Sequence, residues 1–257
     1  MSNKDSVSRT LLIALALCLV CSVIVSMAAV MLKPAQEANK TLDKKRNILA
    51  AAGMLDESKG IDEQFALISS RVVDLRTGKF TDDVDPEKYN QKKAAKDPAQ
   101  SEALGAQRDK AKIRRRENYA VVYLVEPRPG EFDKVILPIR GYGLWSTLYG
   151  FVALESDANT IAGLGFYEHG ETPGLGGEVD NPRWKSLWPG KQVYRNNSVE
   201  IGLTKGVVNT RGANAPWQVD GLSGATLTSR GVTNLVRFWL GEDGFQAFLT
   251  NLKSGEA

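Results

Sequence analysis

An unbroken apolar run near the N-terminus constrains this chain more than any other feature. Leu11 to Leu32 contains no charged residue, and its polar interruptions, Ser22 and Ser26, are small. About 20 residues of α-helix, each rising about 1.5 Å, cross the hydrocarbon core of a bilayer. The sequence therefore predicts a transmembrane helix over residues 11–32, preceded by a short tail of residues 1–10.

A cleaved signal peptide is the competing interpretation, because Ser26-Met27-Ala28 has the small–x–small pattern of a cleavage site. The run is longer than the apolar core of a typical signal peptide, and Lys33-Pro34 follows it where a helix would end. A lipoprotein signal is disfavoured, since Leu17 precedes Cys18 where a small residue is expected. A retained anchor is the favoured prediction.

The two cysteines, Cys18 and Cys21, both lie inside this run. Nothing downstream can therefore form a disulfide or a thiolate metal site. Their C-x-x-C spacing is that of a redox motif, but in a lipid-facing helix they serve as small apolar residues. With His169 as the single histidine, a histidine-based metal site or catalytic triad lacks partners as well. We predict no metal site and no catalytic residue.

Charge says little about topology or partners. Two basic residues precede the run within the first ten positions, and five follow it between Lys33 and Arg46. The positive-inside count alone thus favours a cytoplasmic domain, but large translocated domains can ignore that count. The formal net charge of +3 is too small to indicate a nucleic-acid partner.

The region after the apolar run consists of two segments that differ in composition. Residues 33–76 are predicted to be a helical connection, with one helix over 35–52 that Gly53 ends and a second from Asp62 to Ser70. In the second helix Phe65 and Ile68 are expected to face a core. Residues 77–117 are rich in charge and poor in large apolar side chains, which favours a solvated or partner-facing insertion.

Residues 118–257 are dominated by short β-branched or aromatic segments separated by turn residues. A hairpin turn is expected at residues 157–159, and a last helix from Ser229 to Leu240. Helices on both sides of a strand-rich middle predict an α+β fold. The predicted strands are 119–125, 135–139, 149–155, 160–167, 199–203 and 217–222.

The segment from Asp220 to Ser229 carries the clearest chemical signal. It joins a strand to the N-terminus of the last helix through small residues and four hydroxyls, those of Ser223, Thr226, Thr228 and Ser229. A helix N-terminus offers unpaired N–H groups and a positive dipole end, and both attract phosphate. The alternative is an ordinary helix start, in which Thr228 or Ser229 is the N-cap.

This segment also carries a resemblance. Asp220-x-x-Ser223-Gly224-Ala225-Thr226 resembles the acceptor motif of FAD:protein FMN transferase, whose final threonine is esterified to FMN phosphate. The likeness extends from the apolar run through residues 169–176, His-Gly-Glu-Thr-Pro-Gly-Leu-Gly, to the last helix. The chain resembles the C subunits of Na⁺-translocating NADH:quinone reductase (NQR). The G subunits of RNF complexes share both motifs, but the charged insertion and the length fit the C subunits better.

The resemblance implies a membrane anchor followed by an FMN-binding domain with a twisted, mainly antiparallel sheet and flanking helices. It implies one covalent FMN per chain, attached at Thr226 by a separate Mg²⁺-dependent transferase that uses FAD and releases AMP. The flavin would pass electrons from an iron–sulfur centre to the flavin of the B subunit, on the way to quinone, within a six-subunit complex. The domain would face the periplasm from the bacterial inner membrane.

A glycine-rich loop, residues 171–177, is expected to let the backbone approach a flat ring. Leu175 would press on the ring, Glu171 and Thr172 would meet its heteroatoms, Trp145 would be a second wall, and Lys205 would offset negative charge. The predicted FMN-binding residues are Thr226, Leu222, Ser223, Gly224, Ala225, Thr228, Trp145, Ser146, Thr147, Glu171, Thr172, Gly174, Leu175, Gly176, Lys205 and Gly206.

Two interpretations compete with the flavoprotein. An anchored assembly subunit without redox chemistry would use the hydroxyl-rich loop simply to begin a helix. A hydrolase with Ser223 or Thr226 as nucleophile is disfavoured, because no histidine or paired base lies nearby in sequence. His169 is expected to have a surface or supporting role, and Trp184, Trp188 and Trp217 are expected to be packing residues.

Overall fold

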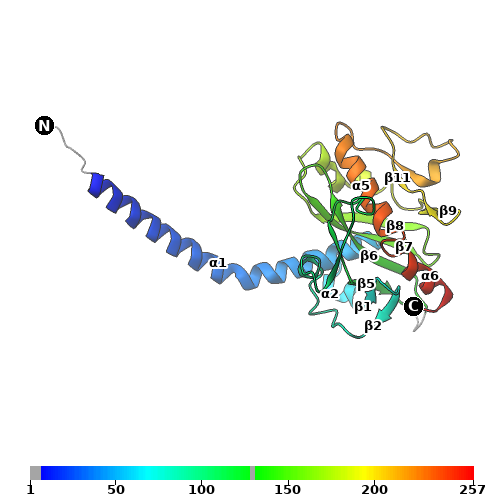
Figure 1. Cartoon of the computed structure of the whole chain (residues 1–257), viewed down its shortest axis with the longest axis horizontal. Coiled ribbons are helices and arrows are strands. Elements are labelled where there is room, and N and C mark those ends of the chain that lie inside the picture. Colours follow the sequence, from blue (N-terminus) through cyan, green and yellow to red (C-terminus); the bar gives the residue numbers. More distant parts are fainter. Residues whose placement is uncertain (1–6, 128–130) are drawn as a thin grey trace. The chain divides into compact units, whose positions relative to one another are not determined.

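The computed structural model describes residues 7–127 and 131–257 (Figure 1). Contacts divide the chain into two units, Met1–Asp43 and Lys44–Ala257. The helix α1, Val7–Ala51, supplies the described part of the first unit and continues into the second. The predicted α+β class is confirmed.

Helix α1 is long and apolar enough to cross a membrane, and none of its most apolar 18-residue window is buried. Two predictions about it are wrong. Residues 7–10 are helical rather than a tail, while residues 1–6 lie outside the described residues. Pro34 does not end the helix but lies inside it. A proline removes one helical hydrogen bond at a cost of about 3 kcal/mol, and the strong helix formers around it, Ala35 to Ala38, let the helix continue.

A six-stranded antiparallel sheet forms the centre of the second unit, in the order β2-β1-β5-β6-β7-β8 (Figure 1). This confirms the antiparallel prediction. The strands are β1 Ile68–Asp74, β2 Lys79–Thr81, β5 Tyr119–Val125, β6 Lys134–Tyr142, β7 Thr147–Glu155 and β8 Ile161–Glu168.

Both faces of this sheet are covered, because side chains alternate along each strand. In β5, Val121 and Tyr123 pack in one cluster with Ile48 from the end of α1. Val122 and its alternate neighbours pack in the other cluster, against helices α5, Thr226–Trp239, and α6, Gln246–Ser254. The strong helical pattern predicted α5, whereas α6 was not predicted.

The remaining elements are short and lie at the edges of this core. They are α2 Ile61–Phe65, α3 Gln91–Ala94, β3 Ser101–Ala103, β4 Arg115–Glu117, η1 Gly176–Asp180, α4 Pro182–Lys185, β9 Tyr194–Arg195, β10 Ser198–Val199, β11 Gly202–Leu203, η2 Ala215–Trp217 and β12 Gln218–Val219. The predicted strand 199–203 is split between β10 and β11, and 217–222 shrinks to β12. The hairpin turn at 157–159 is confirmed, with Asp157 Oδ1 accepting from Asn159 N at 2.9 Å.

The predicted helical connection over 33–76 is wrong in its second half. Helix α2 ends at Phe65, and residues 68–74 form β1 between β2 and β5. Ile68 does face a core, as predicted, but it lies in a strand, where it pairs with Val125 of β5. The β-branched pair Val72-Val73 suits a strand, and the cross-strand pairing decides the outcome.

The charged segment 77–117 is mostly exposed or half-buried, and its role as a solvated or partner-facing insertion stays a prediction. This segment contributes β2, α3, β3 and β4, and two of its charged residues, Arg116 and Glu117, are buried. Arg140 Nη2 of β6 donates to Glu117 Oε2 at 2.6 Å. Paired charges can be buried together, so the charged composition did not exclude a place in the core.

Candidate functional site

The start of α5 differs from the ordinary helix start that Thr228 or Ser229 would make. Ala225 is the N-cap and Thr226 the first helical residue, and no side chain caps this end. The hydroxyl of Thr228 donates to Glu171 Oε2 at 2.7 Å, and the Ser229 hydroxyl accepts from Leu222 N at 2.9 Å. Both are therefore occupied elsewhere, and the first-turn N–H groups receive no side-chain acceptor.

The four hydroxyls of the segment thus fall into two pairs. Thr228 and Ser229 are buried, whereas Ser223 and Thr226 are exposed. Of the exposed pair, Thr226 stands in the first turn of a 14-residue helix, beside the positive end of its dipole. Its position suits a hydroxyl that carries a phosphate group.

A tight turn at residues 222–225 leads into the helix. Ala225 N donates to Leu222 O at 3.1 Å, and both of these side chains are buried. Gly224 has φ +70°, a left-handed conformation that glycine adopts without strain. A Cβ at this position would lie 3.0 Å from Leu175 Cδ2, so Leu175 rests against the turn.

Glu171 joins three separate segments of the predicted site. Its Oε1 accepts from the backbone N–H groups of Leu144, Trp145 and Ser146 at 3.0, 3.0 and 3.2 Å. Its Oε2 accepts from Thr228 on α5. Burial alone would raise the pKa of this carboxyl, but the bonds from Thr228 and from the three backbone N–H groups outweigh it and lower the pKa.

The Glu171 carboxylate is buried and both of its oxygens are bonded within the protein, which gives it a supporting role; its contact with the heteroatoms of a ring stays a prediction. Thr172 is exposed, and its carbonyl accepts from Leu175 N at 3.1 Å and Gly177 N at 2.9 Å. Those bonds fold the glycine-rich loop into a compact turn, in which Gly174 has φ +75°. Gly176 lies at its base, where a Cβ would come within 2.6 Å of Thr228 Oγ1.

The loop between β6 and β7 brings Trp145 to the surface. Trp145 is 66% exposed, which excludes a place in the core. Ser146 Oγ accepts from Gly170 N at 2.6 Å, tying this loop to the end of β8. Thr147 does not join the cluster around Thr228: it lines a separate cavity with Tyr142 and Tyr149.

Lys205 and Gly206 form an exposed turn beside the acceptor motif, with Gly206 at φ +90°. Gly221 N donates to Gly206 O at 2.9 Å, so the turn lies against the start of the motif. Asp220 Oδ1 accepts from Val208 N at 2.8 Å, and its carbonyl accepts from Trp184 Nε1 at 2.9 Å. The first residue of the motif therefore has a structural role.

Trp184 and Trp188 are buried, which confirms them as packing residues. His169 Nε2 lies 2.7 Å from Asp180 Oδ2, and Nδ1 accepts from Glu171 N at 3.2 Å. This geometry agrees with the supporting role expected of His169, since its ring holds the backbone that carries Glu171.

Sequence reasoning missed Leu227, which is 51% exposed in the first turn of α5. Leu227 lies outside the apolar stripe of the helix, which is formed by Val232, Leu235, Val236 and Trp239. A leucine outside the buried stripe of an amphipathic helix is the sequence signal that indicates an exposed apolar contact. Leu175, at 44% exposure, Trp145, and Val207 in the turn beside the motif are further exposed apolar side chains of these loops. Exposed apolar side chains on loops that surround an exposed hydroxyl at a helix N-terminus are typical of a ligand site.

Comparison with known proteins agrees with this geometry. Residues 143–241 match the family described as FMN-binding domain. The C subunit of the Na⁺-translocating NADH-quinone reductase of Pseudomonas aeruginosa is 58% identical, and the alignment covers 100% of both chains. The chain belongs to the C subunits of Na⁺-translocating NADH-quinone reductases. The corresponding C subunit of Vibrio anguillarum is 50% identical over 99% of this chain and 98% of its own.

Solved structures give the same result. NqrC of Shewanella oneidensis is 39% identical, with a TM-score of 0.76, and covers 84% of this chain and 99% of its own. The C subunit of Parabacteroides distasonis, at 24% identity and a TM-score of 0.63 over 88% of this chain and 98% of its own, shows the fold alone. The chain is thus an FMN-binding, electron-carrying subunit of this complex, with other subunits as partners. Together with the apolar α1, this makes it membrane-associated.

The residues present fit FMN. An exposed hydroxyl at an uncapped helix start matches a phosphate, and the exposed apolar side chains of Trp145, Leu175 and Leu227 match a flat ring.

Proposed function

We propose that Thr226 Oγ1 carries FMN as a phosphoester, and that the chain relays electrons inside the NQR complex. The observation that carries this proposal is the free hydroxyl of Thr226 at the uncapped start of α5. The phosphate would accept hydrogen bonds from the first-turn N–H groups, and the helix dipole would favour its negative charge. Lys205, exposed in the neighbouring turn, would offset part of that charge.

The loops that Glu171 holds together supply the remaining contacts. Leu175, Trp145 and Leu227 provide apolar surface for the ring, and Gly224 lets the backbone turn closely beneath Leu175. Because the Glu171 carboxylate bonds to two of these segments, their spacing is set before the cofactor binds. A preformed site loses less conformational entropy on binding than a flexible one.

Attachment would require no base from this chain. Thr226 Oγ1 would form a bond to the flavin-side phosphorus of FAD, the bond from that phosphorus to the bridging oxygen would break, and AMP would leave with that oxygen. A separate Mg²⁺-dependent FAD:protein FMN transferase would accept the threonine proton. The exposure of Thr226 allows such an enzyme to reach it.

Bound FMN supplies one-electron chemistry between an iron–sulfur donor and the flavin of the B subunit, and the electrons continue toward quinone. Helix α1 would anchor the chain in the bacterial inner membrane, with the FMN-binding domain on the periplasmic side. A single helix cannot form an ion pathway, so Na⁺ transport would belong to other subunits of the six.

Mass spectrometry of the Thr226 peptide tests the attachment in chain produced with the transferase. We expect an added FMN phosphoester, lost in Thr226→Ala and kept in the control Ser223→Ala, which removes the neighbouring exposed hydroxyl. An unmodified wild-type peptide, or flavin that survives in Thr226→Ala, would overturn the proposal. A colourless wild-type chain would favour the non-redox assembly subunit instead.

A further inference from the structure

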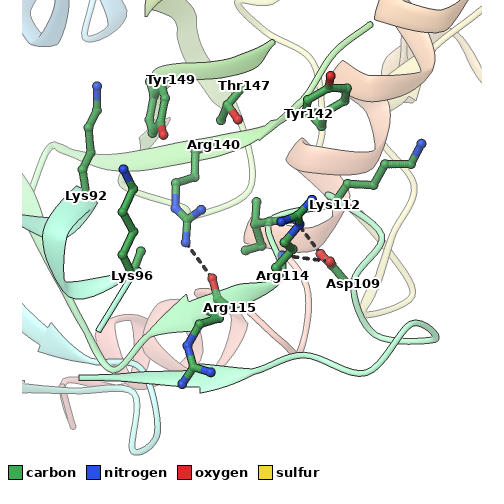
Figure 2. Close-up of a pocket in the computed structure, with 12 residues that line it drawn as sticks. Lys92, Lys96, Asp109, Lys112, Arg114, Arg115, Arg140, Tyr142, Thr147 and Tyr149 are labelled. Carbon is green, nitrogen blue, oxygen red and sulfur yellow. Dashed lines mark hydrogen bonds between the residues drawn. The ribbon is translucent and has the colours of Figure 1, made fainter. Parts of the chain in front are cut away.

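A cavity of about 720 Å³, whose lining includes neither Thr228 nor Glu171, lies between the β6–β7 hairpin and the segment that precedes β4 (Figure 2). Of the predicted flavin residues, only Thr147 lines it. Its volume falls within the range of small-molecule sites, about 300–1,000 Å³, and exceeds what a lone phosphate ion fills.

The lining is strongly basic. Figure 2 shows Lys92, Lys96 and Arg140 on one side of the cavity in this view and Lys112 and Arg114 on the other. The one carboxylate of the lining, Asp109, accepts from the backbone N–H groups of Ile113 and Arg114, each at 2.8 Å. It therefore shapes the loop, and it makes no ion pair with the cations of the lining among the described residues.

Three of these cations are unpaired. Within residues 7–127 and 131–257, no ion pair involves Lys96, Lys112 or Arg114. Lys112 and Arg114 also have φ angles of +54° and +65°, which L-residues adopt at a cost of about 1–2 kcal/mol each. Unpaired cations on strained backbone are typical of residues held in place for a ligand.

Arg140 adds a buried cation to this surface. It is 9% exposed, and its Nη2 donates to Glu117 Oε2 and to Arg115 O at 2.6 and 2.8 Å. Its Nε is buried and has no hydrogen-bond partner among the described residues. An unsatisfied buried N–H is unfavourable by about 1–3 kcal/mol. Because this atom is covered by protein, the cations that a ligand can reach directly are the exposed Lys96, Lys112 and Arg114.

Two aromatic rings complete the lining. Lys92 Nζ pairs with Glu168 Oε2 at 2.5 Å and lies 3.8 Å from the centre of the Tyr149 ring, and Tyr142 is partly exposed. Cations beside flat rings match a molecule that has both a phosphate and an aromatic base. We propose that this cavity binds the phosphate of a small anionic molecule of mononucleotide size. This inference does not depend on the attachment of FMN to Thr226.

Isothermal titration calorimetry of the full, flavin-loaded chain in detergent tests the site, with AMP, adenosine and inorganic pyrophosphate as probes. We expect saturable binding of AMP, no detectable binding of adenosine, and at least about a tenfold loss of AMP affinity in Lys96→Gln and in Arg114→Gln. Lys79→Gln, which removes an exposed lysine outside the cavity, is the matched control and should bind as wild type. Both test positions are surface cations without ion pairs, so folding should survive the changes.

The probes also separate possible sources of the phosphate. AMP that binds more tightly than pyrophosphate supports a nucleotide, whereas equal affinities support the phosphate chemistry alone; either result supports the site. Absence of binding by both, or equal losses in Lys79→Gln and Arg114→Gln, overturns it. Binding of a hexa-aspartate peptide without AMP binding also overturns it, in favour of an acidic partner protein. AMP that binds only flavin-free chain would assign the cavity to the flavin.

Discussion

Replacing Glu171 tests the inference that one carboxylate holds the site together. Glu171→Ala removes the acceptor of four hydrogen bonds, three from residues 144–146 and one from Thr228. Bonds to a charged acceptor contribute about 1.5–3 kcal/mol each, but the loop N–H groups regain water when the carboxylate is lost. We expect a loss of about 3–4 kcal/mol for alanine, and about 1–2 kcal/mol for Glu171→Gln, which keeps one carbonyl acceptor.

Thermal unfolding of the full chain in detergent, followed by circular dichroism at pH 7.5, measures this loss. For a domain of this size 1 kcal/mol lowers Tm by about 2–4 °C, so alanine should lower Tm by roughly 10 °C. Glu63→Gln is the matched control, because Glu63 is exposed on α2, outside the site. Its Tm should equal that of wild type.

The pH dependence separates a charged acceptor from simple packing. Since the pKa of Glu171 is lowered in the folded chain, the ionised form stabilises the fold above the ordinary glutamate pKa of about 4.3. That stabilisation is lost as the pH falls through the lowered pKa. The Tm difference between wild type and Glu171→Gln should therefore be greatest near neutral pH and shrink below about pH 4. A difference that is constant with pH, or absent at pH 7.5, would refute the reasoning.

Three further changes probe the loops around the site. Gly176→Ala places a Cβ 2.6 Å from Thr228 Oγ1 and 2.7 Å from Glu171 Oε2, so we expect a loss of about 1–3 kcal/mol, and a wild-type melting curve would contradict it. Gly224→Ala places an alanine in the left-handed conformation, which destabilises the turn by about 1–2 kcal/mol. We expect a lower ratio of flavin to protein absorbance, and an unchanged ratio would show that the turn does not matter for the flavin. Leu175→Ala should leave the free energy of unfolding within about 0.5 kcal/mol of wild type yet change flavin fluorescence; an unchanged spectrum argues against ring contact.

The central strands were predictable because their pattern is local. The predicted strand 119–125 coincides with β5, whose alternate side chains enter two cores, and β6, β7 and β8 differ by at most three residues at either end. Strand β1 was not predictable in the same way. Its neighbour β5 lies about fifty residues further along the chain, with Ser70 opposite Tyr123, and that pairing overrides the local helical pattern.

The same distinction between local and long-range signals applies to the candidate site. The acceptor motif and the glycine-rich loop can be found from sequence, because each is a short contiguous segment. The inward direction of Glu171 cannot be found that way, since its partners come from the β6–β7 loop and from α5, 25 and 57 residues away. A carboxylate in a glycine-rich loop has the same local signature whether it faces a ligand or the protein interior.

Burial explains why Thr226, and not its neighbour two positions on, suits covalent modification. Both threonines belong to the first turn of α5, but the Thr228 hydroxyl is buried and donates to Glu171, so modifying it would break the contact that joins the loops. The Thr226 side chain is exposed and makes no hydrogen bond within the described residues. Modifying Thr226 therefore leaves the supporting contacts intact, while the first-turn N–H groups remain available to the added phosphate. Within one turn of helix, the chain thus presents a buried structural hydroxyl and, two residues before it, the exposed hydroxyl that we propose carries the phosphate.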